Sequence, residues 1–114
     1  MNLEQQVCSL DLAKRLKELG VKQESYFWWC RYKENGWALS SEIGTESLEE
    51  VAAFTVAELG EMLGANVFSS KSVSGSWLVE LLGGGKGRSF YEKTEANARA
   101  KMLIQLIEQG LLKP

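Results

Sequence analysis

The sequence predicts an α+β fold in a single domain, in which a β-hairpin and a three-stranded antiparallel meander are packed by helices. Three observations predict it. Apolar residues recur at the helical period near both ends of the chain, an aromatic-rich stretch leads into an Asn-Gly pair, and three short β-prone stretches are separated by glycine turns. No Ser/Gly linker or internal repeat divides the 114 residues. The expected order over 1–114 is α-β-β-α-β-β-β-α.

The first predicted helix begins near Ser9 and ends at Gly20. Leu12, Leu16 and Leu19 share one face at about 100° per residue. Serine is a favourable N-cap, and glycine readily adopts the left-handed conformation that follows a helix.

Aromatic residues dominate 26–33, and Asn35-Gly36 favours a two-residue type I′ hairpin loop. With this loop, the facing residues are Glu34 and Trp37, Tyr32 and Leu39, and Cys30 and Ser41. The expected core face then comprises Tyr26, Trp28, Cys30, Tyr32, Trp37 and Leu39. The other face comprises Phe27, Trp29, Arg31, Lys33, Ala38 and Ser40. Phe27 and Trp29 are expected to be covered by an internal helix, the alternative being a partner molecule.

Residues 42–54 are acidic and weakly patterned, so we expect mostly loop. Thr55 and Glu58 form a capping-box pattern that opens a short helix ending at Gly64. Its apolar side contains Val56, Leu59 and Leu63.

A meander is predicted from 66–73, 77–82 and 88–92, with a Ser74-Gly75 turn and a glycine loop at 83–87. The last helix is expected to begin after Thr94 and to run to Gly110, with apolar residues at the helical period.

The residues expected to be largely buried are Tyr26, Trp28, Tyr32, Trp37, Leu39, Leu59, Trp77, Leu81, Leu103 and Ile107. Cys8 and Cys30 are expected to be two packed thiols rather than a disulfide, because the N-terminus shows no secretory signal and the protein is therefore expected in the cytoplasm. No stretch approaches the length of a membrane span, so we expect no membrane partner.

The composition excludes much familiar chemistry. The chain has no histidine, and Asp11 is the only aspartate, so Ser-His-Asp sites, Cys-His nucleophiles and imidazole metal sites cannot be built from it. The glycine loop does not match a Walker A motif, because Lys86 is followed by Gly87, nor a dinucleotide fingerprint, because Arg88 stands where glycine is needed. Glu58 and Glu61 lack a second acidic motif for a cation. We expect no enzymatic activity, cofactor or metal.

Three stretches of the chain are distinctive: 7–13 running into 20–25, then 54–63, and then 94–104. Together they resemble a family of small uncharacterised proteins encoded by bacteriophages and prophages. The strands followed by an Ala-rich helix are also loosely similar to phage ABA-sandwich domains. The resemblance implies a phage or prophage origin in a bacterial host; it implies no activity for any residue.

The expected function is therefore that of a non-enzymatic accessory protein that binds a host protein, a phage protein or itself. The candidate contact residues on the hairpin are Phe27, Trp29, Arg31 and Lys33. The alternative is nucleic-acid binding, because 55–109 follow the order of a double-stranded RNA-binding domain. Its candidate residues form a basic edge, defined as Lys86, Arg88, Lys93, Arg99 and Lys101. We expect weak or no binding, because Glu92 and Glu95 interrupt this edge and residues 34–80 carry eight glutamates against one lysine.

Overall fold

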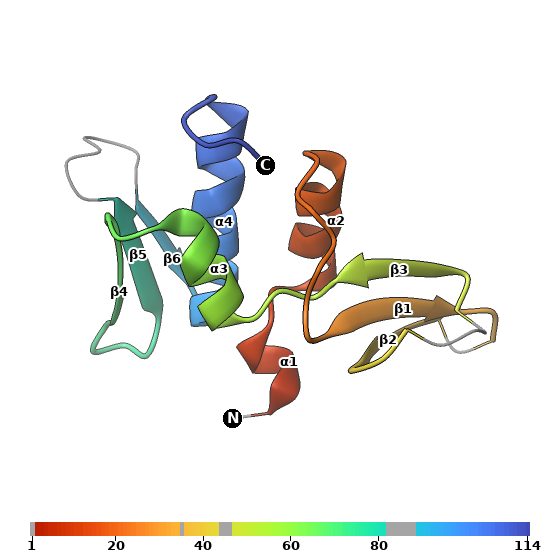
Figure 1. Ribbon diagram of the computed structural model, residues 1–114. Coiled ribbons are helices and arrows are strands. Elements are labelled where there is room, and N and C mark those ends of the chain that lie inside the picture. Colours follow the sequence, from red (N-terminus) through yellow and green to blue (C-terminus); the bar gives the residue numbers. More distant parts are fainter. Residues whose placement is uncertain (1, 35, 44–46, 82–88) are drawn as a thin grey trace.

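The computed structural model describes residues 2–34, 36–43, 47–81 and 89–114 (Figure 1). The helices in these ranges are α1 (Leu3–Gln6), α2 (Leu10–Glu18), α3 (Val56–Leu63) and α4 (Glu95–Glu108). The strands are β1 (Trp28–Tyr32), β2 (Gly36–Ser40), β3 (Glu49–Ala52), β4 (Val67–Lys71), β5 (Trp77–Leu81) and β6 (Ser89–Glu92). They form two antiparallel sheets, ordered β2-β1-β3 and β4-β5-β6, which confirms the α+β class and the meander. None of the described helices is long and apolar enough to cross a membrane.

The helix ends agree with the sequence signals. The side chains of Ser9, Thr55 and Thr94 each accept a hydrogen bond from a backbone N–H in the first turn of the helix that follows. Gly20 and Gly110, just beyond the ends of α2 and α4, have φ angles of 94° and 73°. These positions favour glycine because a Cβ atom is strained there.

The N-terminus contains an additional turn of helix that the sequence pattern did not predict. Asn2 caps α1, and the chain then becomes extended at Val7, which bridges to Thr55. This extended residue separates α1 from α2, so the expected helix start near Ser9 is confirmed.

The expectation of mostly loop over 42–54 missed β3, which occupies Glu49–Ala52 in that segment. Val51 and Ala52 are fully buried, and β3 pairs with β1 along its whole length. The Glu49 side chain is partly exposed, and its carboxylate lies 3.5 Å from the Arg31 guanidinium. A strand of four residues is too short to show a clear alternation of apolar and polar residues. The two glutamates at its start also make the segment resemble a loop, although its second half is buried.

The predicted hairpin register is also wrong. Tyr32 pairs with Gly36 rather than with Leu39, and Trp29 pairs with Leu39. This difference of three positions is odd, so it moves Trp37 and Leu39 to the face that carries Trp29. Gly36 is therefore the first residue of β2, with φ of 70°, and not part of a two-residue loop. The predicted loop residue Asn35 lies outside the described residues.

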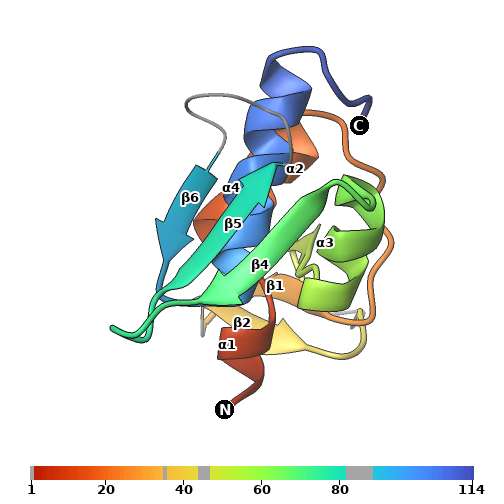
Figure 2. The ribbon, with the colours of Figure 1, turned by 90° about the vertical axis from the view of Figure 1, so that its left-hand side faces the viewer.

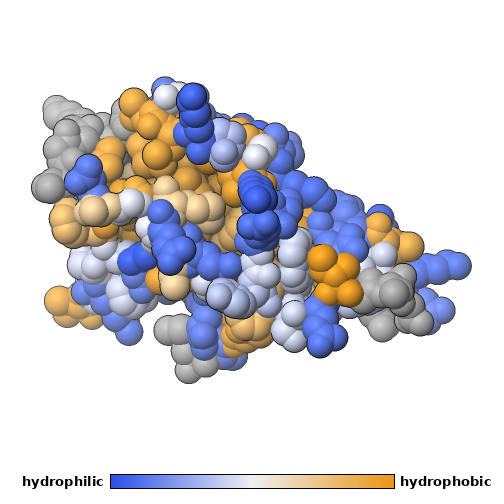
Figure 3. Space-filling view, in the orientation of Figure 1, coloured by the Kyte–Doolittle hydropathy of each residue, from blue (hydrophilic) through white to orange (hydrophobic). Residues whose placement is uncertain are grey.

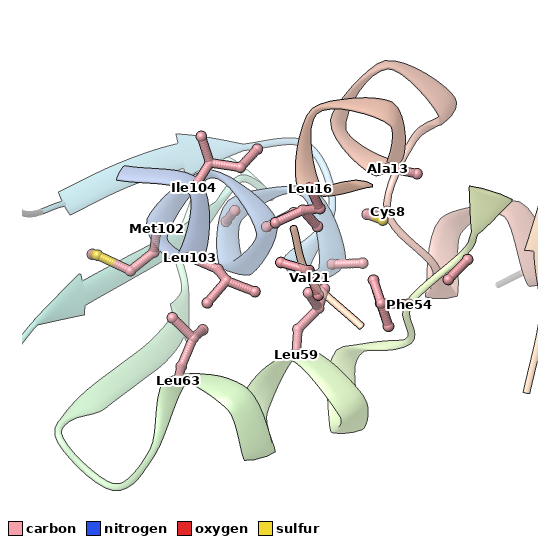
Figure 4. Close-up of a cluster of buried hydrophobic side chains, with 14 of the residues drawn as sticks. Cys8, Ala13, Leu16, Val21, Phe54, Leu59, Leu63, Met102, Leu103 and Ile104 are labelled. Atoms are coloured by element: carbon pink, nitrogen blue, oxygen red, sulfur yellow. The ribbon is translucent and has the colours of Figure 1, made fainter. Parts of the chain in front are cut away.

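One cluster of buried apolar side chains connects the elements, and α4 lies at its centre. This helix packs against α2, α3, β5 and β6. Figure 2 shows sheet β4-β5-β6 across one side of α4, and Figure 4 shows side chains from α2, α3 and α4 converging. Three alanines of α4 are fully buried: Ala96, Ala98 and Ala100. Their small side chains allow the neighbouring helices and strands to approach α4 closely. Sheet β2-β1-β3 extends to the other side and reaches the helices through β3 and α2 (Figure 1).

The core prediction is confirmed for Leu59 and Leu103, which are buried, and is wrong for Tyr26, which is 75% exposed. Tyr26 lies in a bend before β1, so the alternation of the strand does not apply to it. The other members are partly buried: Trp28, Tyr32, Trp37, Leu39, Trp77, Leu81 and Ile107. Cys8 and Cys30 are both buried and free, as expected.

Candidate interaction surface

Sheet β2-β1-β3 has two different faces. On one face the pairing forms two cross-strand rows, Trp37-Arg31-Glu49 and Leu39-Trp29-Val51. On the other face the rows are Ala38-Cys30-Glu50 and Ser40-Trp28-Ala52. The larger apolar side chains of β2 therefore all lie on the first face, and its small ones on the second.

A depression of about 540 Å³ lies between the first face and α1, and we call it the tryptophan depression. Its lining residues are Asn2, Leu3, Glu4, Trp29, Trp37, Ala38 and Leu39. The Trp29 indole Nε1 donates a hydrogen bond to the Cys8 carbonyl at 3.0 Å, which fixes the ring. The Lys14 Nζ lies 4.8 Å from the ring centroid of Trp37, a cation–π distance. Both tryptophans remain partly exposed, so the expected covering of Trp29 by a helix is incomplete.

The backbone groups of β1 show which way those of β2 point. Ala53 N–H donates to the Phe27 carbonyl at 2.9 Å, so Phe27 directs its backbone groups toward β3. Alternate residues of an antiparallel strand direct theirs to opposite sides. Trp28, Cys30 and Tyr32 therefore face β2.

Their partners in β2 are Ser40, Ala38 and Gly36, which use their own backbone groups to bond β1. Trp37 and Leu39 consequently direct their N–H and C=O groups to the outer edge of β2. Within the described ranges, no other strand pairs with that edge. In Figure 1, β2 forms the lower border of its sheet.

This edge also lacks the charges that usually protect sheet edges. Residues 36–40 contain no charged residue and no proline, whereas every other edge strand contains a charged residue: Glu49 and Glu50 in β3, Lys71 in β4 and Glu92 in β6. Natural proteins commonly place charges, proline or bulges on free edges to prevent pairing with another chain. Within the described residues, the β2 edge therefore has neither a partner strand nor these protective features.

The candidate residues on the hairpin are only partly brought together. Trp29 and Arg31 share the face of the tryptophan depression, with Arg31 paired to Glu49. Phe27 precedes β1 and is partly buried, and Lys33 is exposed in the turn. Sequence reasoning missed Trp37 and Leu39 as members of this face, because the assumed loop length reversed their orientation.

Among the described residues of the basic edge, Arg99 and Lys101 are held in ion pairs. Arg99 donates from Nη1 to the Val56 carbonyl at 3.1 Å and from Nε to Ser69 Oγ at 2.8 Å, and it pairs with Glu95 at 3.0 Å. Lys101 pairs with Glu92 at 3.1 Å. Lys93 is exposed, and Lys86 and Arg88 lie outside the described residues. Arg99 thus joins α3, α4 and β4.

A second depression, of about 560 Å³, lies between residues 22–26 and α3. Its central carboxylate, Glu58, already accepts hydrogen bonds from Ser25 Oγ at 2.8 Å, Thr55 N–H at 2.9 Å and Tyr26 N–H at 3.3 Å. Glu58 is therefore a structural group that joins the start of α3 to the segment before β1.

Apolar side chains also gather over α3 and α4 (Figure 3). The depression there is smaller, about 250 Å³, and is lined by Val21, Lys22, Met62, Leu103, Lys113 and Pro114. It contains no aromatic side chain and no strand edge, so it is a weaker candidate for recognition.

Burial raises the pKa of the Cys8 thiol to about 12, and it also raises the pKa of Cys30. Neither cysteine is therefore poised as a thiolate.

In the described part of the chain, no three His, Cys, Asp or Glu residues gather to hold a metal. No protein-family model, curated protein or solved structure matches the chain.

Proposed function

We propose that this chain is a non-enzymatic protein that binds an extended segment of another polypeptide at the β2 edge and the tryptophan depression. One observation carries the proposal: two partly exposed tryptophans lie beside a strand edge whose outward backbone groups have no partner strand in the described ranges. An extended segment satisfies such an edge with main-chain hydrogen bonds, and adjoining pockets select its side chains.

Tryptophan is the residue type most suited to anchor such an interface. Anchor residues of protein interfaces are enriched in Trp, Tyr and Arg, and truncating one costs about 2 kcal/mol or more of binding free energy. Trp29 is held in place by its bond to Cys8, so little side-chain entropy is lost when a ligand covers it.

The charges favour a polypeptide over a nucleic acid. Arg31 beside the depression is paired with Glu49, and Glu4 adds a negative charge to the lining. Arg99 and Lys101 of the basic edge are likewise paired with glutamates. Phosphate binding requires several available cations, and each ion pair reduces that number.

The resemblance to phage and prophage proteins adds the origin to this proposal. We place the chain in the cytoplasm of a bacterial host, with a host protein, a phage protein or a second copy as its partner. The surface described above is compatible with each of the three, because main-chain hydrogen bonding does not depend on the identity of the partner.

A selection experiment tests the proposal. A displayed library of random linear peptides is selected on the wild-type protein immobilised at low density, so that single chains present a free β2 edge, and the enriched peptides are tested on Trp37→Ala and on Tyr91→Ala. Tyr91 is an exposed aromatic residue on the other sheet and serves as the matched control. We expect peptides rich in apolar residues, whose affinity falls at least about 30-fold with Trp37→Ala and stays unchanged with Tyr91→Ala.

Amide chemical shifts identify the site directly. The bound peptide should shift the amides of Trp37 and Leu39 most strongly, because these two N–H groups point outward. The proposal is overturned if no peptide is enriched, or if the enriched peptides bind Trp37→Ala as well as the wild type.

A further inference from the structure

We infer that a second copy of this chain occupies the β2 edge, so that two β2 strands pair antiparallel across a twofold axis. This inference rests on the proposed function and names the partner. It follows from the directions of the backbone groups and from the order of side chains in Gly36–Ser40.

The backbone determines the register. In an antiparallel pair, two residues that point toward each other exchange both of their N–H···O bonds. Only Trp37 and Leu39 of β2 point outward, so each must face an outward residue of the other copy. Pairing Trp37 with Leu39 of the second copy satisfies both residues on both chains, which gives four hydrogen bonds centred on Ala38.

The side chains fit this register. At the centre, Ala38 faces Ala38 of the second copy in a non-hydrogen-bonded pair, where the Cα atoms approach to about 4.5 Å and small side chains fit best. Gly36 then faces Ser40 of the second copy, so this pair also joins two small residues. On the opposite face, Trp37 packs beside Leu39 of the second copy, next to the tryptophan depression.

The symmetry of the segment is the reason to choose a second copy over an unrelated strand. Small residues at 36, 38 and 40 and large apolar residues at 37 and 39 read the same in either direction about Ala38. A twofold interface requires such self-complementarity, because each patch meets itself. The five residues carry no charge, so within the paired strands no like charges face each other.

A charge exchange at Ala38 tests the pairing. Ala38 is exposed, so Ala38→Glu and Ala38→Lys leave the folded chain intact while placing two like charges opposite each other in the dimer. By sedimentation equilibrium we expect the wild type to have twice the mass of the chain, each variant alone to have the mass of one chain, and an equimolar mixture of the two to recover the doubled mass. Ser70→Glu, an exposed substitution on edge strand β4, is the control that stays dimeric.

Hydrogen exchange of the wild type gives a second measurement that needs no variant. The amides of Trp37 and Leu39 should exchange slowly at high protein concentration and become fast on dilution, whereas that of Ala38, bonded to β1, does not change.

A monomeric wild type overturns the inference, as does a dimer that both Ala38 variants leave intact. Neither result affects the peptide selection, because an open β2 edge still accepts a displayed peptide. Failure of the second-copy inference and failure of the proposed function are therefore distinguishable.

Discussion

The guanidinium of Arg99 lies against Gly60, at the one place in α3 where the helix has no side chain to exclude it. A Cβ atom at Gly60 would overlap Arg99 Nη1, the atom that donates to the Val56 carbonyl. Glycine within a helix costs about 1 kcal/mol relative to alanine. Gly60 thus weakens α3 locally, and the contact it permits joins α3 to α4.

This relationship predicts a change of sign. Gly60→Ala should lower the free energy of unfolding by about 1 kcal/mol in the wild type, because displacing the Arg99 guanidinium breaks its hydrogen bonds to Val56 and Ser69, worth about 1 kcal/mol each, and this loss exceeds the gain in helix propensity of up to about 1 kcal/mol. In an Arg99→Ala background, Gly60→Ala should raise the free energy of unfolding by up to about 1 kcal/mol through helix propensity. Urea unfolding of the four proteins measures both effects; the same sign in both backgrounds would contradict the contact.

Glu58 should matter for stability far more than its neighbour Glu61. Glu58→Ala removes the capping box of α3 and the acceptor for Ser25 and Tyr26, so we expect the free energy of unfolding to fall by about 1–3 kcal/mol. Glu61 is exposed on the same helix, and Glu61→Ala should change it by less than about 0.5 kcal/mol. Equal losses in the two variants, measured by chemical denaturation, would show that the Glu58 bonds contribute nothing.

The buried Cys8 thiol should make the protein less stable at high pH. Burial raises its pKa from 9.0 to about 12, so between these values the unfolded chain has lost the proton while the folded chain retains it. The unfolded state then binds fewer protons, and the free energy of unfolding falls as the pH rises from about 9 toward 12. Cys8→Ala should show a shallower fall over this window in thermal melts, whereas parallel curves for the two proteins would argue against the shift.

Nucleic-acid binding should be weak or absent. In low salt we expect no salt-dependent retardation of labelled duplex RNA or DNA, because Arg99 and Lys101 are held in ion pairs. Micromolar binding that is lost in a double variant, Lys86→Glu with Arg88→Glu, would replace the protein-interaction proposal with the nucleic-acid alternative.

The helix ends and the meander could be predicted from the sequence because their causes are local. The cap at Ser9 and the capping box at Thr55 each involve residues three apart, and the left-handed position at Gly20 depends on that residue itself. The periodic apolar residues of α4 likewise predict a helix without reference to any other element, although more of its residues are buried than one stripe contains. These features therefore follow from residues that lie side by side in the chain.

The candidate site required the tertiary structure. The register of β1 and β2 depends on the contacts that Trp37 and Trp29 make. Trp37 contacts Lys14 of α2, and Trp29 donates to the Cys8 carbonyl, and both partners lie far from the turn in sequence. An odd shift reverses every side chain of a strand, so an error in the turn alone placed Trp37 and Leu39 on the wrong face of the sheet.

The role of Arg99 depended on tertiary contacts in the same way. Its charge, read from the sequence alone, indicated a ligand contact, but its partners Val56 and Ser69 are 43 and 30 residues away. The sequence by itself determined the type and ends of most elements. Only the tertiary structure decided which side chains make contacts within the fold and which stay exposed for a partner, because those contacts join residues that are distant in sequence.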